Sequence, residues 1–159
     1  MSQREYFQWR PLAILLLAQD PTDQDREFIE SSFENSQKFS LTTNLAAWAT
    51  AHVEINGAQA VQQIEEEYFG DSSRSVKEIR AVVIALSVQG NNGHTDLRDR
   101  IVTSYGVALQ NHPQVAGLIA SDLIDWRKNV YCEQMIKIIK NPELELDAME
   151  IRAIQLYLR

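Results

Sequence analysis

The stretch SVKEIRAVVIALSVQG at residues 75–90 decides the fold that this chain is expected to adopt. Ser75 and Glu78 have the spacing of a capping box, in which each side chain accepts a hydrogen bond from the other residue's backbone N–H at a helix start. Behind the box, apolar residues recur at steps of three and four on one stripe, namely Val76, Ile79, Val83 and Leu86. The run Gly90-Asn91-Asn92-Gly93 then offers residues that tolerate the left-handed conformation at helix ends. The stretch therefore predicts an amphipathic helix with a defined start and stop.

The same spacing of apolar residues extends over nearly the whole chain in both directions. Turn signals cut the chain into segments of helical length, as at Asp20-Pro21, Asn56-Gly57, Gly70-Asp71 and Asn141-Pro142. No run of alternating β-branched or aromatic residues is long enough to require a sheet. We therefore predict an all-α fold of about nine helices in a single domain over residues 1–159. Residues 1–8 are expected to form a tail, with Pro11 in the first turn of the first helix.

The predicted helices repeat in pairs. Alternate helices are expected to begin at Pro11, Leu41, Ser75, Pro113 and Glu145, which are spaced by 30, 34, 38 and 32 residues. These spacings are typical of helical-pair repeats, in which each pair buries its apolar face against the next pair. Short loops between the helices indicate antiparallel neighbours.

Three consecutive segments carry a resemblance to a known architecture. VKEIRAVVIALSVQG, LRDRIVTSYGVALQNHP and QVAGLIASDLIDWRKN contain small residues that let facing helices approach closely, at Ala81, Ala85, Gly106, Ala108, Ala116, Gly117 and Ala120. From about Ser40 to its end, the chain resembles α-helical solenoids of the HEAT and armadillo kind, while no segment matches the tetratricopeptide signature in register. The resemblance implies a right-handed superhelical stack of antiparallel helix pairs and a role in protein binding.

Composition excludes several classes of function. The chain has 15 basic and 22 acidic residues, and its net charge of −7 opposes the approach of nucleic acid and of anionic lipid. Its longest apolar run, residues 11–18, is less than half of the ~20 residues that a membrane-spanning helix needs. Cys132 is the only cysteine, and no secretion signal opens the chain. We therefore expect a cytoplasmic protein that neither spans a membrane nor binds nucleic acid.

Motifs for catalysis, metal binding and cofactor binding are missing from the sequence. Neither GxGxxG nor GxxxxGK[ST] occurs, so no glycine-rich loop is available to cradle a phosphate. His52, His94 and His112 lie in three different segments, and no helix carries a Glu-x-x-His pair. His52 falls on an apolar stripe and is expected to be a hydrogen-bonded core or interface histidine, while Cys132 is expected to be a buried thiol. We expect no cofactor, no metal and no catalytic residue.

The most site-like cluster is formed by Asp122, Asp125, Trp126 and Arg127, which place two carboxylates beside an indole and a guanidinium on one helix. Three interpretations stay open. Asp122 faces inward and ties a neighbouring repeat; the cluster contacts a partner, as Trp48 would elsewhere; or the carboxylates take part in catalysis. As candidate partner contacts we take Trp48, Asp122, Asp125, Trp126 and Arg127.

Three functions follow as hypotheses. The first is a non-catalytic scaffold for protein–protein interaction, in which exposed aromatic and arginine side chains carry affinity. The second is a regulatory or assembly domain of a larger bacterial-type polypeptide, because the helical pattern LDAMEIRAIQLYLR runs to the last residue. The third is an enzyme or small-ligand binder with an inter-helix pocket near Asp122, Asp125 and Trp126. A protein partner is expected in the first two cases, and a homo-oligomer stays open.

Overall fold

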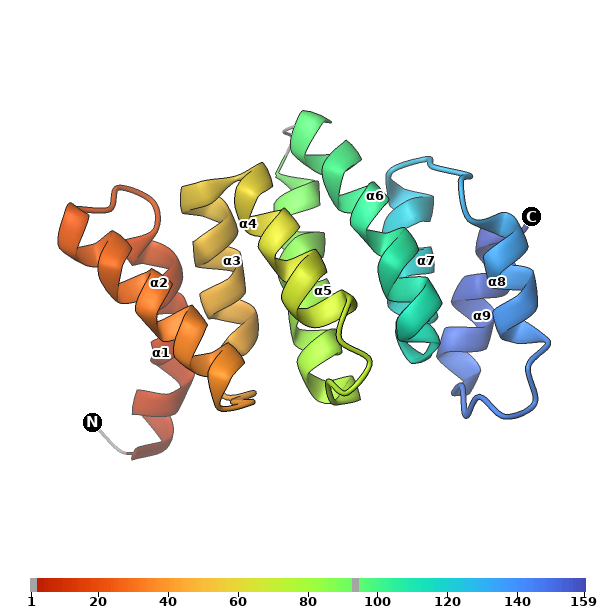
Figure 1. Ribbon diagram of the computed structural model, residues 1–159, viewed down its shortest axis with the longest axis horizontal. Coiled ribbons are helices and arrows are strands. Elements are labelled where there is room, and N and C mark those ends of the chain that lie inside the picture. The colour runs from red at the N-terminus through yellow and green to blue at the C-terminus, as the bar shows by residue number, and fades with distance from the viewer. Residues whose placement is uncertain (1–2, 93–94) are drawn as a thin grey trace.

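Helix α5 (Val76–Asn91) lies in the middle of the molecule and begins as the sequence predicts (Figure 1). The Ser75 hydroxyl accepts a hydrogen bond from the backbone N–H of Glu78 at 3.3 Å, and the Glu78 carboxylate accepts one from the backbone N–H of Ser75 at 3.0 Å. The helix ends at Asn91, within the predicted stop. Gly90 is itself helical and so does not supply the left-handed residue.

The computed structural model describes residues 3–92 and 95–159, with side chains from Trp9 onward, so the predicted turn residues Gly93 and His94 lie outside it. Over the described residues the chain forms nine α-helices and no strand, which confirms the all-α prediction and the helix number. The helices besides α5 are α1 (Gln3–Leu17), α2 (Asp23–Lys38), α3 (Leu45–Asn56), α4 (Ala58–Ile64), α6 (Thr95–Asn111), α7 (Ala116–Asp125), α8 (Cys132–Ile139) and α9 (Ala148–Tyr157). A π-helical turn, η1 (Glu65–Phe69), extends α4, and a 3-10 turn, η2 (Pro113–Val115), precedes α7.

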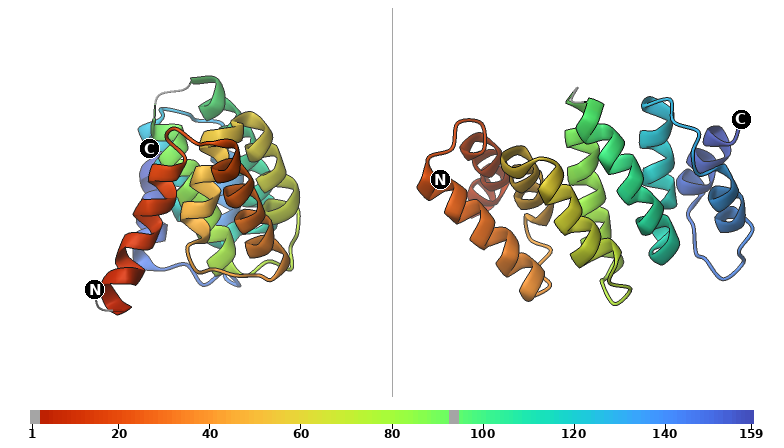
Figure 2. Two further views of the ribbon diagram at one scale, coloured as in Figure 1. Left: turned by 90° about the vertical axis from the view of Figure 1, so that its left-hand side faces the viewer. Right: turned by 45° about the horizontal axis from the view of Figure 1, so that its top comes forward.

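The helices form two layers (Figures 1 and 2). Helices α1, α3, α5, α7 and α9 follow one another as neighbours in one layer, which we call the odd layer. Helices α2, α4, α6 and α8 make the even layer, and α1 and α9 lie at opposite ends of the long axis. The odd helices begin at residues 3, 45, 76, 116 and 148. Apart from the first, each of these starts lies within four residues of the start that the repeat spacing predicts.

The two largest deviations from the sequence-based boundaries lie near the N-terminus. Helix α1 begins at Gln3 and contains Pro11 in its interior, so residues 3–8 belong to a helix rather than to a tail. Proline fixes φ near the helical value and removes one N–H donor, and here the helix continues through that loss. Helix α3 begins at Leu45 and not at Leu41, because Ser40 and Asn44 adopt left-handed conformations with φ values of 50° and 60°.

Buried apolar side chains form one continuous core from Ile14 in α1 to Tyr157 in α9. The close helix approach predicted from small residues is found at two of the named positions. A Cβ atom on Gly117 would lie 2.7 Å from Cα of Glu150, and one on Gly106 would lie 2.8 Å from the Tyr131 hydroxyl. Glycine at these positions therefore lets α9 and the segment before α8 pack directly on their neighbours.

None of the described helices combines the length and the apolar character that crossing a bilayer requires.

Candidate functional site

Asp122, the centre of the predicted cluster, is buried between three helices. Its Oδ1 accepts a hydrogen bond from Ser87 Oγ of α5 at 2.6 Å, and its Oδ2 accepts one from the Tyr105 hydroxyl of α6 at 2.5 Å. Burial raises the pKa of the Asp122 carboxyl, although the hydrogen bonds from Ser87 and Tyr105 act in the opposite direction. Asp122 of α7 therefore faces inward and ties α5, α6 and α7 together, and we call this arrangement the Asp122 tie.

Trp126 packs against the same junction. Its ring stacks nearly parallel to that of Tyr105, with centroids 5.9 Å apart, and its Nε1 donates a hydrogen bond to Asn91 Oδ1 at 2.9 Å. Arg98 lies over the Trp126 ring, 5.8 Å from its centroid, while its Nε donates to the Gly90 carbonyl at 2.7 Å. A Cβ atom on Gly90 would lie 2.3 Å from Cζ2 of Trp126, so the indole fits only because residue 90 has no side chain.

The candidate partner contacts thus separate into two groups. Trp48, Asp122 and Trp126 are only 5 to 7% exposed, and Trp48 packs edge-on against Phe28 with centroids 5.5 Å apart. Their side chains are therefore engaged inside the fold and are not presented to a partner. Asp125 and Arg127 are exposed at the end of α7. Because Asp122 is inside and Asp125 outside, the structure does not bring the two carboxylates together as a pocket near Trp126 would require.

Two histidines lie in polar networks inside the fold. His52 stacks on Phe33, and its ring nitrogens are within hydrogen-bonding distance of Gln63 Oε1 at 2.9 Å and Asn56 Nδ2 at 3.1 Å. This confirms the expectation of a hydrogen-bonded core histidine. His112 is also buried, with Nε2 3.2 Å from the Tyr68 carbonyl, and burial lowers the pKa of His112.

Metal-ligating and nucleophilic groups do not gather in the described part of the chain. Among the described side chains, residues 9–92 and 95–159, no three from His, Cys, Asp or Glu are close enough to hold a metal ion. Cys132 is half-buried against the core, and its Sγ lies 4.0 Å from the Asn129 carbonyl. The prediction of a buried thiol therefore holds only in part.

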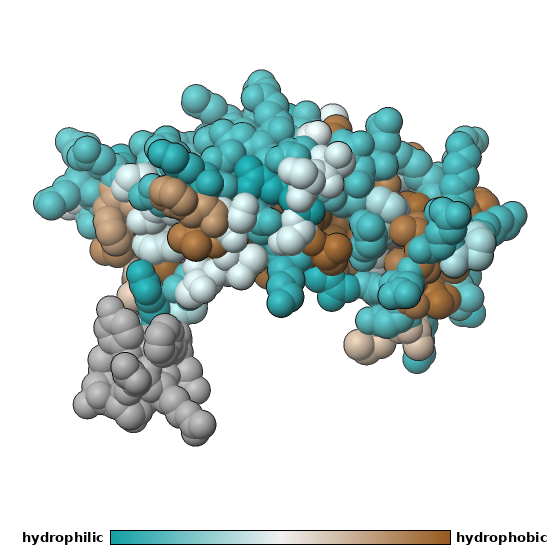
Figure 3. All heavy atoms as spheres, turned by 60° about the horizontal axis from the view of Figure 1, so that its bottom comes forward, coloured by the Kyte–Doolittle hydropathy of each residue, from teal (hydrophilic) through white to brown (hydrophobic). Residues whose placement is uncertain are grey.

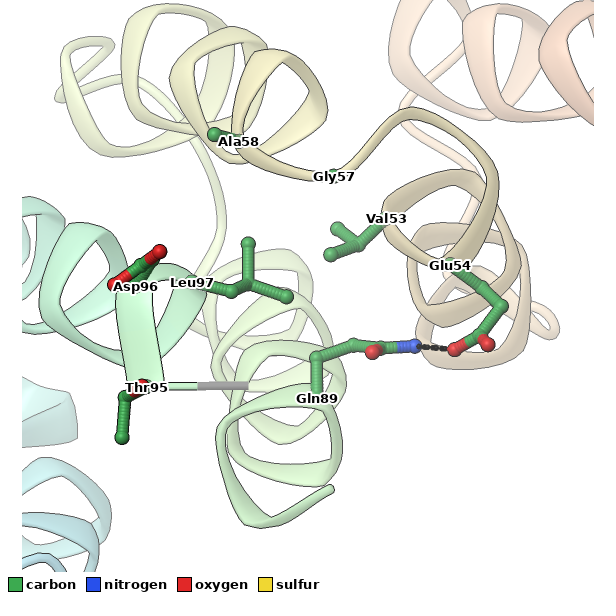
Figure 4. Close-up of a pocket in the computed structure, with 8 residues that line it drawn as sticks. All are labelled: Val53, Glu54, Gly57, Ala58, Gln89, Thr95, Asp96 and Leu97. Atoms are coloured by element: carbon green, nitrogen blue, oxygen red, sulfur yellow. Dashed lines mark hydrogen bonds between the residues drawn. The ribbon is translucent and has the colours of Figure 1, made fainter. Parts of the chain in front are cut away.

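A cavity of about 520 Å³ lies where the turn between α3 and α4 meets the end of α5 and the start of α6 (Figure 4). Its volume is within the range of small-molecule sites. Apolar contacts come from Val53, Ala58 and Leu97, with Gly57 at the turn, and polar groups come from Glu54, Gln89, Thr95 and Asp96. Figure 4 shows Glu54 and Asp96 on opposite sides of the cavity, with Val53 and Leu97 between them.

Among the described residues of the cavity wall, Gln89 is the one buried polar side chain, with 2% of its surface exposed. Its Nε2 donates to the Thr50 carbonyl at 3.1 Å and to Glu54 Oε2 at 2.8 Å. Both partners accept hydrogen bonds only, so the amide nitrogen must face them. Among the described residues no donor bonds to the amide oxygen, Oε1.

Sequence reasoning missed this cavity, because Glu54, Gln89 and Asp96 come from three separate segments. The only signal in the sequence is that Gln89 continues the buried stripe of α5, three residues after Leu86.

A row of apolar side chains lies on the outer face of the odd layer. Ile84 and Val88 of α5, Ile124 of α7, and Met149 and Leu156 of α9 are 39 to 78% exposed, and we call these five residues the apolar row. Between the three helices runs a groove of about 260 Å³, lined by Arg80, Gly117, Leu118, Ser121, Asp147, Met149, Glu150 and Ala153. Residues three or four apart on a helix lie side by side, and groove residues precede row residues by these steps, as Arg80 precedes Ile84, Ser121 precedes Ile124 and Ala153 precedes Leu156. The row and the groove therefore share one face.

The lower edge of the molecule, as drawn in Figure 1, exposes hydrophobic residues mainly toward its two ends. Figure 3 shows hydrophobic patches near both ends of that surface, with hydrophilic and intermediate residues over most of the area between them.

Comparison with known proteins adds no relative. No protein-family model matches the chain, and neither a curated protein nor a solved structure shows significant similarity to it.

Proposed function

We propose that this chain is a non-catalytic scaffold or regulatory domain that binds another protein, built as a HEAT-like right-handed superhelical stack of antiparallel helix pairs. The two-layer order of the helices and the regular starts of the odd helices support the stack. In such a stack the face of one layer forms an extended surface, and the odd layer carries that surface here.

The apolar row is the observation that carries the proposal. Its five side chains come from three neighbouring helices, and one of them, Met149, also lines the groove between these helices. Single exposed apolar residues are ordinary, whereas an aligned group rimmed by polar residues is typical of a protein-binding surface. Arg80 and Glu150 form an ion pair in the groove wall, and Asp125 and Arg127 lie beside Ile124 in the chain. These charged groups supply the polar rim that protein interfaces have.

The experiment that tests the proposal is site-specific photo-crosslinking in the native cell. A benzoylphenylalanine placed at Ile84, or separately at Ile124, is expected to capture the same protein, because both positions belong to one row. The matched control is the same residue at Thr103, which is exposed on α6 in the even layer. Equal capture from Thr103, or different proteins from Ile84 and Ile124, would contradict a specific surface.

A purified partner then allows a quantitative test. The double substitution Ile84→Ser and Val88→Ser removes two exposed apolar contacts and is expected to weaken binding at least tenfold, since a few central residues carry most of the binding energy. Circular dichroism checks that the fold is retained. Unchanged affinity in the folded variant would place the partner elsewhere.

A further inference from the structure

The cavity at the α3–α4 turn has a distribution of polar groups that the scaffold function does not explain. Among the described residues that line it, the side-chain polar groups are two carboxylates, a hydroxyl and an amide whose nitrogen is already bonded, and none of these residues is Lys, Arg or His. A ligand in this cavity therefore meets acceptors at nearly every polar position. The matching ligand donates hydrogen bonds and carries positive charge.

The positions of the acceptors narrow the ligand further. Glu54 and Asp96 lie on opposite sides of the cavity, and Val53 and Leu97 occupy the space between them (Figure 4). One small cation could bind to only one of the two carboxylates at a time. A molecule with a charged group at each end and an apolar stem between them can meet both carboxylates and cover the apolar middle.

Gln89 gives an independent reason to expect a donor at the Glu54 end. Its side chain is almost fully buried, and its Oε1 accepts no hydrogen bond from a described residue. This oxygen is not one of the fully buried polar atoms, so it can accept a hydrogen bond from a molecule in the cavity that Gln89 lines. An ammonium group bound to Glu54 has three donors and can serve the carboxylate and a neighbouring oxygen together.

The dipoles of the surrounding helices neither strengthen nor weaken the preference of the cavity for a positively charged ligand. The last turns of α3 and α5, which favour cations, and the first turns of α4 and α6, which favour anions, all border the cavity. Because helix ends of both signs meet there, the two carboxylates set the sign of the local field. The net charge of −7 acts in the same direction.

We propose that this cavity is a binding site for an aliphatic diamine, with one ammonium group at Glu54 and Gln89 Oε1 and the other at Asp96. The site does not depend on the scaffold function, because its lining residues are distinct from the apolar row. The apolar stem of the ligand lies against Val53 and Leu97.

The test is a titration of the isotope-labelled full chain, followed through its amide resonances by NMR. The probes are 1,3-diaminopropane, 1,4-diaminobutane, 1,5-diaminopentane and 1,6-diaminohexane, with n-butylamine as the singly charged control and 1,4-butanediol as the neutral one. Saturable shifts are expected at Gly57, Ala58 and Leu97, with an optimum chain length. Affinity for n-butylamine is expected to be at least tenfold lower, since it can meet only one carboxylate.

Two conservative variants locate the site. Glu54→Gln keeps an acceptor for Gln89 Nε2, and Asp96→Asn keeps the size of the side chain, so both are expected to fold. Each should lower the diamine affinity to that of n-butylamine for the wild type, whereas Asp125→Asn, at an exposed acid that does not line the cavity, should leave it unchanged. Equal binding of the monoamine and the diamines, or full diamine affinity in both cavity variants, would overturn the proposal. These outcomes leave the crosslinking test of the apolar row unaffected.

Discussion

Two polar side chains of helix α5 each donate a hydrogen bond to a carboxylate of a neighbouring helix, and one of these carboxylates is buried whereas the other is exposed. Ser87 reaches Asp122 of α7, which is buried and whose two oxygens both accept hydrogen bonds. Gln89, two residues further on, reaches Glu54 of α3, which is exposed and borders an open cavity. The same kind of hydrogen bond, from a polar α5 side chain to an acid, is therefore buried between α5 and α7 but accessible from a cavity between α5 and α3.

The difference shows how one helix can serve stability and binding together. At the Asp122 tie, every polar group has a partner inside the protein, and an aromatic stack covers the junction. At the cavity, the amide oxygen of Gln89 and the carboxylates of Glu54 and Asp96 remain available to a ligand. A closed polar network stabilises a unique arrangement of helices. The exposed carboxylates at the cavity are hydrated instead and can exchange water for a ligand.

Breaking the Asp122 tie is expected to have the largest effect on stability. Asp122→Ala removes the acceptor of the buried Tyr105 hydroxyl and of the half-buried Ser87 hydroxyl, so the free energy of unfolding should fall by about 3 kcal/mol. Urea denaturation followed by circular dichroism measures the change. Asp125→Ala, three residues away and exposed, is the matched control and should change little. If the two variants proved equally stable, the tie would not contribute as the geometry indicates.

Adding one methyl group at the same junction should have the next largest effect. Gly90→Ala places a Cβ atom against the Trp126 ring, where 2.3 Å is far shorter than a van der Waals contact, and should cost about 2 kcal/mol through overpacking. The tryptophan fluorescence should shift to longer wavelength as the ring moves outward. Trp126→Phe, combined with Gly90→Ala, relieves the clash, so the double variant should lose less stability than the sum of the single ones. If the stability losses of the two single variants simply added up in the double variant, the proposed contact between residue 90 and the Trp126 ring would be contradicted.

The pH dependence of stability sharpens the comparison of buried acids. Because burial raises the pKa of Asp122 in the folded state, its stabilising contribution is complete below the usual value near 3.8 and is lost as the pH rises through the folded pKa. The wild type should therefore gain free energy of unfolding relative to Asp122→Asn as the pH falls from 7 toward 4. Urea denaturation at a series of pH values measures this difference. A difference that stays constant or shrinks would contradict the sign.

Glu78 is expected to show the opposite sign. Burial alone would raise its pKa, but hydrogen bonds from Ser75 and Arg74 prevail and hold the pKa of Glu78 below its usual value near 4.5. Its contribution is therefore present above that value and lost as the pH falls through the folded pKa. Relative to Glu78→Gln, the wild type should lose stability as the medium is acidified, in the same denaturation series.

The two sides of α5 also show which features the sequence could predict and which it could not. The capping box at Ser75 and Glu78 and the alternate helix starts follow from local patterns. The structure has the capping box where it was expected and, apart from the first, each start within four residues of the expected one. The inward orientation of Asp122 was one of three open interpretations, since the sequence around it does not show Ser87 and Tyr105 as its donors. The cavity could not be predicted, because its walls meet only when α3, α5 and α6 pack.

Trp48 and Trp126 illustrate the same limit. A tryptophan in a helix is equally compatible with a core position and with an exposed contact, and only the packing of Phe28 and Tyr105 decides for the core here. Gly90 was taken as a helix stop, but the reason for glycine at this position is a ring that comes from 36 residues further along the chain. Local propensity cannot supply such long-range contacts.

The smallest expected effect lies on the open side of α5. Glu54→Gln keeps an acceptor for Gln89 Nε2 and removes only a solvent-exposed charge, so the free energy of unfolding should change by less than about 0.5 kcal/mol. The same urea denaturation that detects Asp122→Ala measures it. A loss comparable to that of Asp122→Ala would mean that Glu54 is a structural tie like Asp122. A small change, together with lost diamine binding, would instead separate the acid that holds the helices together from the acid that meets a ligand.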